Sequence, residues 1–142
     1  MKKTVICHSV EDTEKLGFEV ASQIGTSGIT FIALYGGLGA GKTAFVRGFT
    51  SFYDKEACVM SPTYNLVNVY GGIYHFDMYR INDEDDLYSI GFFDYDDGRN
   101  IIITEWSENI EYALPDKYLK VTINKNDQIP DIREIILETV GF

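Results

Sequence analysis

The chain has 142 residues and a formal net charge of −10, with 12 lysines and arginines against 22 aspartates and glutamates. This length predicts one domain, residues 1–142, with a real core but little room for a separate lid or substrate domain. The acidic balance argues against strong direct binding of nucleic acid, because a phosphate backbone repels negative charge.

The sequence shows no run of about 18 apolar residues and no signal-peptide core, so we expect a cytoplasmic protein without membrane contact. Cys7 and Cys58 have neither a metal-ligand spacing nor an evident pairing, which favours buried, reduced thiols. His8 and His75 are too few and too scattered to form a metal site alone, and packing or surface positions are expected for both.

The first elements in chain order are a strand, a helix and a second strand. Residues 4–7 predict the first strand, and Ser9 or Asp12 can cap a helix that Gly25 ends. Residues 29–35 form a continuous apolar run rich in β-forming residues, which predicts a buried strand.

A glycine-rich segment follows that strand and matches the phosphate-loop pattern G-x-x-x-x-G-K-[ST]. Glycines let successive backbone N–H groups close around phosphate oxygens, and the helix that follows directs its positive end at the same anion. Lys42 would approach the β and γ phosphates, and the Thr43 hydroxyl would face Mg²⁺. We therefore expect a nucleoside triphosphate to be bound by Gly36, Gly37, Leu38, Gly39, Ala40, Gly41, Lys42 and Thr43.

A loop and a hairpin come next. Related nucleotide hydrolases place a loop that senses the γ-phosphate after the phosphate-loop helix, and Thr63 is the candidate hydroxyl, although a plain surface turn is the alternative. Gly71-Gly72 is a two-residue hairpin signal between two β-rich runs. The predicted switch loop comprises Ser61, Pro62, Thr63 and Tyr64.

Two apolar strands end in an acidic residue. Residues 73–77 end in Asp77, and residues 101–105 end in Glu105. A phosphate-loop enzyme needs an acid at the carboxyl end of a strand to hold Mg²⁺ or its water. Either side chain alone could be an ordinary exposed acid, but two in this position favour a nucleotide site, with Lys42, Asp77 and Glu105 as its catalytic residues.

The remaining segments leave two alternatives open. Acidic residues at 82–86 and 94–97 surround aromatic side chains, and they suit either a solvated helix start with a turn or a docking surface for a basic partner. A short helix is expected at 87–90 and a turn at 94–98. Residues 132–140 have helical spacing but also the β-branched content of a strand paired with 118–123.

These elements predict an α/β fold, a P-loop NTPase-like three-layer domain with a mixed sheet and an antiparallel hairpin. Five sequence blocks then resemble the TsaE (YjeE) family of bacterial P-loop ATPases, which support threonylcarbamoyladenosine synthesis in tRNA. The resemblance spans about residues 9 to 123, with the blocks in family order. They are LYGGLGAGKT (34–43), RGF (47–49), SPTYNLV (61–67), YHFDMYR (74–80) and EW (105–106).

The resemblance implies a cytoplasmic ATPase that uses ATP and Mg²⁺ and acts with the TsaD and TsaB proteins, resetting their complex between rounds of modification. It implies that Thr43 and Glu105 bind Mg²⁺, that Asp77 is the Walker-B-like acid and that Trp106 sits beside the nucleotide pocket. It also favours a strand at 133–140. Family members often carry an acid where this chain has Gly37, a wildcard position at which phosphate binding should survive.

Two other functions remain open. A nucleotide-gated protein-binding module would use the same loop with incidental hydrolysis. A small P-loop kinase would need an acceptor pocket and a basic lid, yet Arg99 is the only cation between Arg80 and Lys117. No arginine finger is evident in the chain, so turnover in isolation is expected to be slow.

Overall fold

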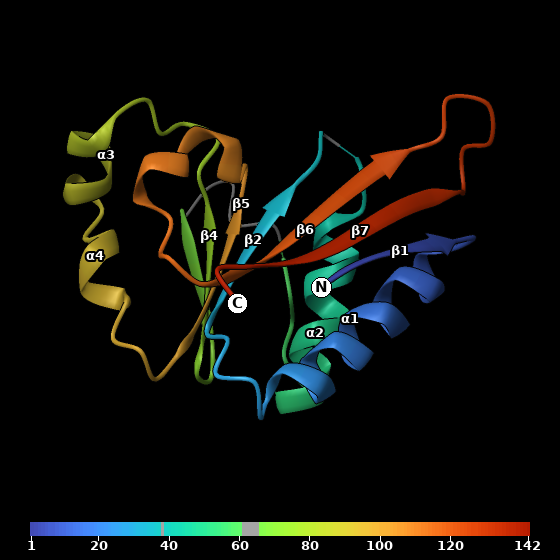
Figure 1. Cartoon of the computed structure of the whole chain (residues 1–142), viewed down its shortest axis with the longest axis horizontal. Helices are drawn as coiled ribbons and strands as arrows, with labels where there is room; N and C mark the ends of the chain where they lie inside the picture. Colours follow the sequence, from blue (N-terminus) through green and yellow to red (C-terminus); the bar gives the residue numbers. More distant parts are fainter. Residues whose placement is uncertain (38, 61–65) are drawn as a thin grey trace.

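The computed structural model describes residues 1–37, 39–60 and 66–142 (Figure 1). These residues form a seven-stranded sheet in the order β1-β7-β6-β2-β5-β4-β3. The strands are β1 (Lys2–Cys7), β2 (Phe31–Tyr35), β3 (Val67–Tyr70), β4 (Ile73–Asp77), β5 (Ile101–Glu105), β6 (Tyr118–Lys125) and β7 (Arg133–Val140). The helices are α1 (Val10–Ile24), α2 (Lys42–Tyr53), α3 (Glu84–Ser89) and α4 (Phe92–Tyr95), with 3₁₀ turns η1 (Ser107–Asn109) and η2 (Glu111–Ala113).

The sheet is mixed, as predicted. Strand β2 runs parallel to β5 and β6, and β4 runs parallel to β5. The β3–β4 hairpin is antiparallel, as are the pairs β6–β7 and β1–β7. Because β2, β4 and β5 point the same way, their carboxyl ends meet at one edge of the sheet.

Helices cover both faces of the sheet, which confirms the three-layer α/β prediction. Alternate residues of β2 serve the two faces: Ile32 and Leu34 join the core under α1 and α2, whereas Phe31 and Ala33 join the core under α3 and α4. Figure 1 shows α1 and α2 together on one side and α3 and α4 on the other. No helix in the described part of the chain is long and apolar enough to span a membrane.

Helices α1 and α2 cross in close contact at two glycines. A Cβ at Gly48 would overlap the carbonyl oxygen of Glu14, and a Cβ at Gly17 would overlap that of Phe45. Arg47 and Glu14 add an ion pair of 2.8 Å at the edge of the crossing. This contact positions α2, and with it the phosphate loop at its N-terminus.

Several local predictions are refined by the structure. Ser9 caps α1 by accepting from the Asp12 N–H at 3.1 Å, as predicted. The segment 133–140 is a strand, held between β1 and β6, so the strand alternative is confirmed. The turn expected at 94–98 is partly wrong, because Phe92 is buried against the aromatic rings of Phe31 and Phe76 and draws residues 92–95 into α4.

The structure also decides the positions expected for the cysteines and for His75. Cys7 is a buried free thiol as predicted, but Cys58 is exposed, because it lies in the irregular segment after α2. His75 has one of the two positions expected of it, since it is packed in the interior and fully buried in β4. Beyond that expectation, it is hydrogen-bonded to an acid of the adjacent strand.

Candidate nucleotide-binding site

The phosphate loop connects the end of β2 to the start of α2. Gly39 and Gly41 have positive φ values of 71° and 106°, a region that favours glycine. A Cβ at Gly36 would lie 2.7 Å from the carbonyl oxygen of Ile123, so the loop also packs closely against β6. Leu38 lies outside the described residues, so its predicted backbone contact stays a prediction. The glycines therefore serve both the turn and the close packing of the loop.

Lys42 begins α2 and extends back across the phosphate loop. Only 6% of the residue is exposed, and its Nζ donates to the carbonyl oxygen of Gly36 at 2.7 Å. The same Nζ lies 4.0 Å from the centroid of the Trp106 ring. The ammonium group is thus held at the loop by one hydrogen bond and one cation–π contact.

The two strand-terminal acids lie next to one another. Asp77 pairs with Glu105 in the parallel register of β4 and β5, and both are buried, at 6% and 4% exposure. Asp77 Oδ1 accepts from the backbone N–H of Tyr79 at 2.9 Å. The parallel register explains why acids 28 residues apart in sequence meet at one edge.

The acids and Lys42 share one electrostatic environment. Burial lowers the pKa of the Lys42 ammonium below its usual value. The carboxylates of Glu105, Glu108 and Asp77 oppose that shift, since negative charge nearby favours the protonated amine. Burial also raises the pKa of the Glu108 carboxyl, with Lys42 acting in the opposite direction. The buried Lys42 side chain therefore lies among groups of opposite charge.

The oxygen atoms near the loop suit Mg²⁺. Thr43, in the first turn of α2, supplies a hydroxyl, and Asp77 and Glu105 supply carboxylates. Among the residues that the structure describes, no cluster of three or more His, Cys, Asp or Glu could hold a metal. Magnesium at nucleotide sites is usually held by one or two carboxylates together with phosphate oxygens and water. The three side chains fit that donor set.

Trp106 follows β5 directly and has a left-handed backbone, with φ of 57°. Such a conformation costs a non-glycine residue about 1–3 kcal/mol and is found most often at functional sites. The indole ring stacks at a tilt on Tyr79, with 4.9 Å between the ring centroids, as well as lying under Lys42. The structure thus brings Trp106 to the loop, where the resemblance implies that it lies.

Arg133 is a site residue whose contact with the phosphate loop was not predicted from the sequence. From the start of β7, its Nε donates to the carbonyl oxygen of Ala40 at 2.8 Å and its Nη2 to that of Gly39 at 3.3 Å. A cavity of about 150 Å³ lies beside this contact, bordered by Thr13 and Asp131. No local signal in the sequence links residue 133 to a loop more than 90 positions away.

His75 is the second missed residue, and its Nε2 lies 2.5 Å from Glu105 Oε2. A signal was present, since residues two apart in a strand share a face and His75 is two positions before Asp77. The predicted switch loop Ser61–Pro62–Thr63–Tyr64 lies outside the described residues, so its role stays a prediction.

Comparison with known proteins decides the family. The family model described as threonylcarbamoyl adenosine biosynthesis protein TsaE matches residues 7–135. The chain belongs to the TsaE family. The tRNA threonylcarbamoyladenosine biosynthesis protein TsaE of Haemophilus influenzae is 37% identical over 125 residues, which cover 85% of this chain and 78% of that protein. The protein of the same name from Bacillus subtilis is 35% identical over 114 residues, covering 78% and 70%.

The fold agrees with this family assignment. The crystal structure of Bacillus subtilis YdiB superposes with a TM-score of 0.75 at 25% sequence identity, covering 100% of this chain and 87% of that chain. The family match includes the phosphate loop, both strand-terminal acids and Arg133. The site residues thus fall within the part of the chain that is shared with TsaE proteins.

Proposed function

We propose that this chain is a Mg²⁺-dependent ATPase that serves threonylcarbamoyladenosine biosynthesis on tRNA. The observation that carries the proposal is the meeting of the Lys42 ammonium with the buried carboxylates of Asp77 and Glu105 at a glycine loop. This grouping belongs to a TsaE-family chain whose named relatives act in tRNA threonylcarbamoyladenosine biosynthesis. Family membership supports the biosynthetic process in this proposal, and the grouped side chains support ATP hydrolysis as the reaction.

Each of these residues has a separate role in the proposed phosphoryl transfer. Backbone N–H groups of the loop and the N-terminus of α2 bind phosphate oxygens, and Lys42 offsets the charge that builds up on the γ-phosphate. Thr43 and Glu105 would hold Mg²⁺, and Asp77 would accept a hydrogen bond from the attacking water. The cation, when bound, offsets negative charge on the phosphates.

We infer that turnover depends on TsaD and TsaB. The sites of an ATPase that works quickly alone usually include an arginine that reaches the transferred phosphate. Among the residues that the structure describes, the arginine at this loop is Arg133, and it donates to loop carbonyl groups instead. The partners would also carry the tRNA, since the net charge of −10 disfavours RNA on this chain.

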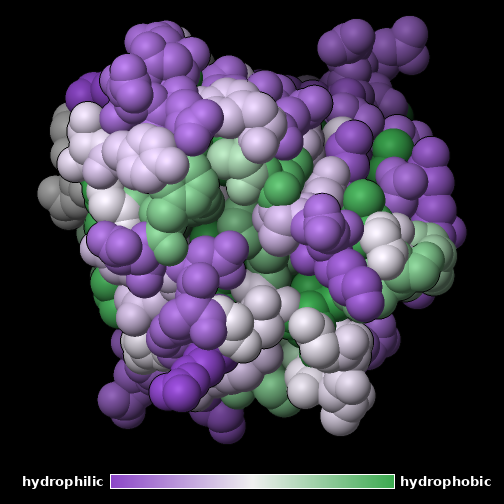
Figure 2. Space-filling view, turned by 60° about the vertical axis from the view of Figure 1, so that its left-hand side comes forward, coloured by the Kyte–Doolittle hydropathy of each residue, from purple (hydrophilic) through white to green (hydrophobic). Residues whose placement is uncertain are grey.

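The acidic surface around α3 is the proposed docking face. Exposed aromatic rings lie among its acids, with Tyr88 63% and Phe93 37% exposed and their ring centroids 4.8 Å apart. Figure 2 turns this side of the molecule forward and shows hydrophobic residues between hydrophilic ones. Aromatic side chains within a charged rim are typical of protein–protein interfaces, so a basic surface on TsaD or TsaB fits this face.

The test compares wild type with Glu105→Gln in two assays. Calorimetry with ATP and Mg²⁺ measures binding, and phosphate release measures hydrolysis, each with and without TsaD and TsaB. We expect both proteins to bind ATP and only wild type to release phosphate, faster with the partners present. Absence of ATP binding by wild type would overturn the proposal. Equal support of tRNA modification by both proteins would favour a nucleotide-gated module instead.

A further inference from the structure

We propose that His75 is a positioning residue for Glu105, and that a hydrogen-bond chain from the Met60 main chain through Tyr70 orients its ring. The inference rests on the proposed function for the role of Glu105. It extends that function by assigning work to β3 and to the interior of β4, outside the phosphate loop and the strand-terminal acids.

The contact between His75 and Glu105 is short and buried. His75 Nε2 lies 2.5 Å from Glu105 Oε2, and the two residues are 0% and 4% exposed. They occupy neighbouring parallel strands, β4 and β5, whose backbones are hydrogen-bonded along their length. A carboxylate held this way on one oxygen has a fixed orientation.

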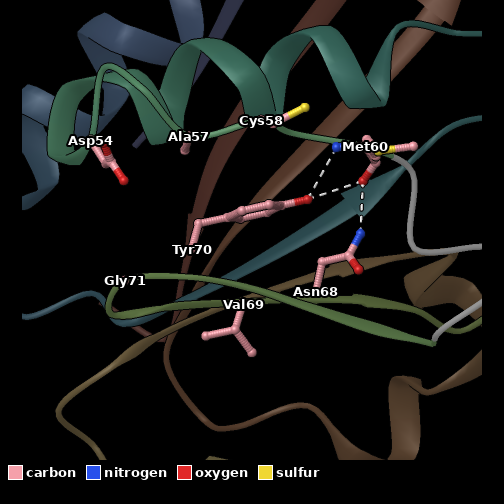
Figure 3. A pocket seen from close by; sticks show the side chains of 8 residues that line it. All are labelled: Asp54, Ala57, Cys58, Met60, Asn68, Val69, Tyr70 and Gly71. Atoms are coloured by element: carbon pink, nitrogen blue, oxygen red, sulfur yellow. Dashed lines mark hydrogen bonds between the residues drawn. The ribbon is translucent and has the colours of Figure 1, made fainter.

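Tyr70 connects His75 to the segment after α2. Its hydroxyl oxygen lies 3.4 Å from His75 Nδ1 and accepts from the Met60 backbone N–H at 3.2 Å. Figure 3 shows Tyr70 and Asn68 pointing from the same face of β3 toward Met60, while Val69 points away. Asn68 Nδ2 donates to the Met60 carbonyl oxygen at 3.1 Å.

Hydrogen bonds restrain both sides of the His75 ring. A carboxylate only accepts, so His75 Nε2 must carry a hydrogen toward Glu105. The Tyr70 hydroxyl donates to the Met60 carbonyl oxygen at 3.0 Å, and that oxygen also accepts from Asn68. These bonds hold the Tyr70 hydroxyl beside His75 Nδ1 and thereby restrict rotation of the ring.

This arrangement has a consequence for cation binding. Without His75, the Glu105 carboxylate loses its fixed orientation and is free to turn toward the Lys42 ammonium, whose charged form it already favours against the effect of burial. Removing a side chain that orients a metal ligand typically costs 10–100-fold in metal affinity. The role of His75 is therefore to hold Glu105 ready, whereas ATP itself would be held by the phosphate loop.

The first experiment examines the free protein by NMR of the histidine rings. The chain has two histidines, so a His8→Gln variant assigns both rings. We expect His75 to carry a hydrogen on Nε2, and we expect Tyr70→Phe to shift the Nδ1 resonance more than the Nε2 resonance. A His75 ring without the Nε2 hydrogen overturns the proposal.

The second experiment measures Mg²⁺ affinity by fluorescence. Trp106 is the single tryptophan and adjoins Glu105, so it reports on the site. With a non-hydrolysable ATP analogue bound, we expect His75→Ala to raise the Mg²⁺ concentration at half-saturation about tenfold. Affinity for the metal-free analogue should be unchanged. His75→Gln, which keeps a donor near the Nε2 position, should recover most of the loss, and His8→Ala should match wild type.

The outcomes separate this inference from the proposed function. If wild type responds to Mg²⁺ and His75→Ala reaches half-saturation at the same Mg²⁺ concentration, the positioning role of His75 is overturned. A wild type that binds no analogue overturns the proposed function, whereas the NMR experiment still decides the hydrogen-bond chain. If circular dichroism shows that His75→Ala is unfolded, Tyr70→Phe tests the same hydrogen-bond chain, because it preserves side-chain volume. A Mg²⁺ concentration at half-saturation equal to that of wild type in Tyr70→Phe overturns the orienting role of Tyr70.

Discussion

At the scale of single residues, the site depends on charges placed out of water. Lys42 is buried beside Asp77 and Glu105, and the indole of Trp106 covers its ammonium group. Interactions of this kind are stronger in a pocket of low dielectric than in water. Because these side chains are buried, a charge left without its partner lowers the free energy of unfolding. Substitutions here therefore affect chemistry and stability together.

Removing the Lys42 charge tests its role directly. We expect Lys42→Met to lower the rate of ATP hydrolysis about 100-fold or more, because the γ-phosphate loses a preorganised positive charge. Phosphate release under saturating partners measures the effect. Lys15→Met, an exposed position on α1, is the matched control and should retain the wild-type rate. A Lys42→Met protein with wild-type turnover would show that the loop does not carry the chemistry.

The lowered pKa of Lys42 also predicts a dependence of stability on pH. A lysine whose pKa is lower when folded binds fewer protons in the folded state, so folding gains stability as pH rises from that lowered value toward 10.5. The Lys42→Met variant has no ammonium group at this position and therefore cannot gain this stability. We therefore expect the Tm of Lys42→Met minus that of wild type to fall between neutral pH and pH 10.5. A constant difference across this range would contradict the shift.

At the scale of elements, the crossing of α1 and α2 positions the phosphate loop. We expect Gly48→Ala to lower the free energy of unfolding by about 1–3 kcal/mol, because the added methyl group meets the backbone of α1. Urea denaturation measures the change. Gly25→Ala is the control, since a Cβ there meets nothing within 4 Å and the backbone is right-handed. Equal losses in both variants would show that the crossing is not the cause.

The elements that could be predicted from sequence are those with local signals. The strand before the loop, the Gly71-Gly72 hairpin and the acids Asp77 and Glu105 each follow from a short pattern. The last strand, 133–140, was ambiguous because its apolar spacing fits two periods, and only its partners β1 and β6 decide it. The two-residue spacing of His75 and Asp77 was a local signal that both side chains share one face of β4, whereas the contact of Arg133 with Ala40 joins segments that no window of sequence contains.

At the scale of the whole molecule, the candidate nucleotide site and the proposed docking face lie on different elements. The site lies at the carboxyl edge of the parallel strands, whereas α3 presents acids and aromatic rings to solvent. An acidic face speeds association with a basic partner and makes that association sensitive to salt. Nucleotide chemistry and partner contact can therefore be altered separately.

Charge reversal on α3 tests the docking face. We expect the double substitution Glu84→Lys and Asp85→Lys to weaken association with TsaD and TsaB, chiefly by slowing the association rate. The association rate of this variant should also depend less on salt concentration than that of wild type. Surface plasmon resonance at two salt concentrations measures both. Glu11→Lys with Glu19→Lys makes the same charge change on exposed positions of α1 and should bind like wild type. Equal weakening by both pairs would indicate net charge rather than a docking face.

We propose that ATP hydrolysis by this chain sustains tRNA modification through its partners. The most direct measurement follows threonylcarbamoyladenosine formed over many turnovers by TsaD and TsaB, with their substrates and tRNA in excess, in the presence of wild type or Glu105→Gln. We expect continued product formation with wild type and arrest after about one round with Glu105→Gln. Equal product formation with the two proteins would contradict it.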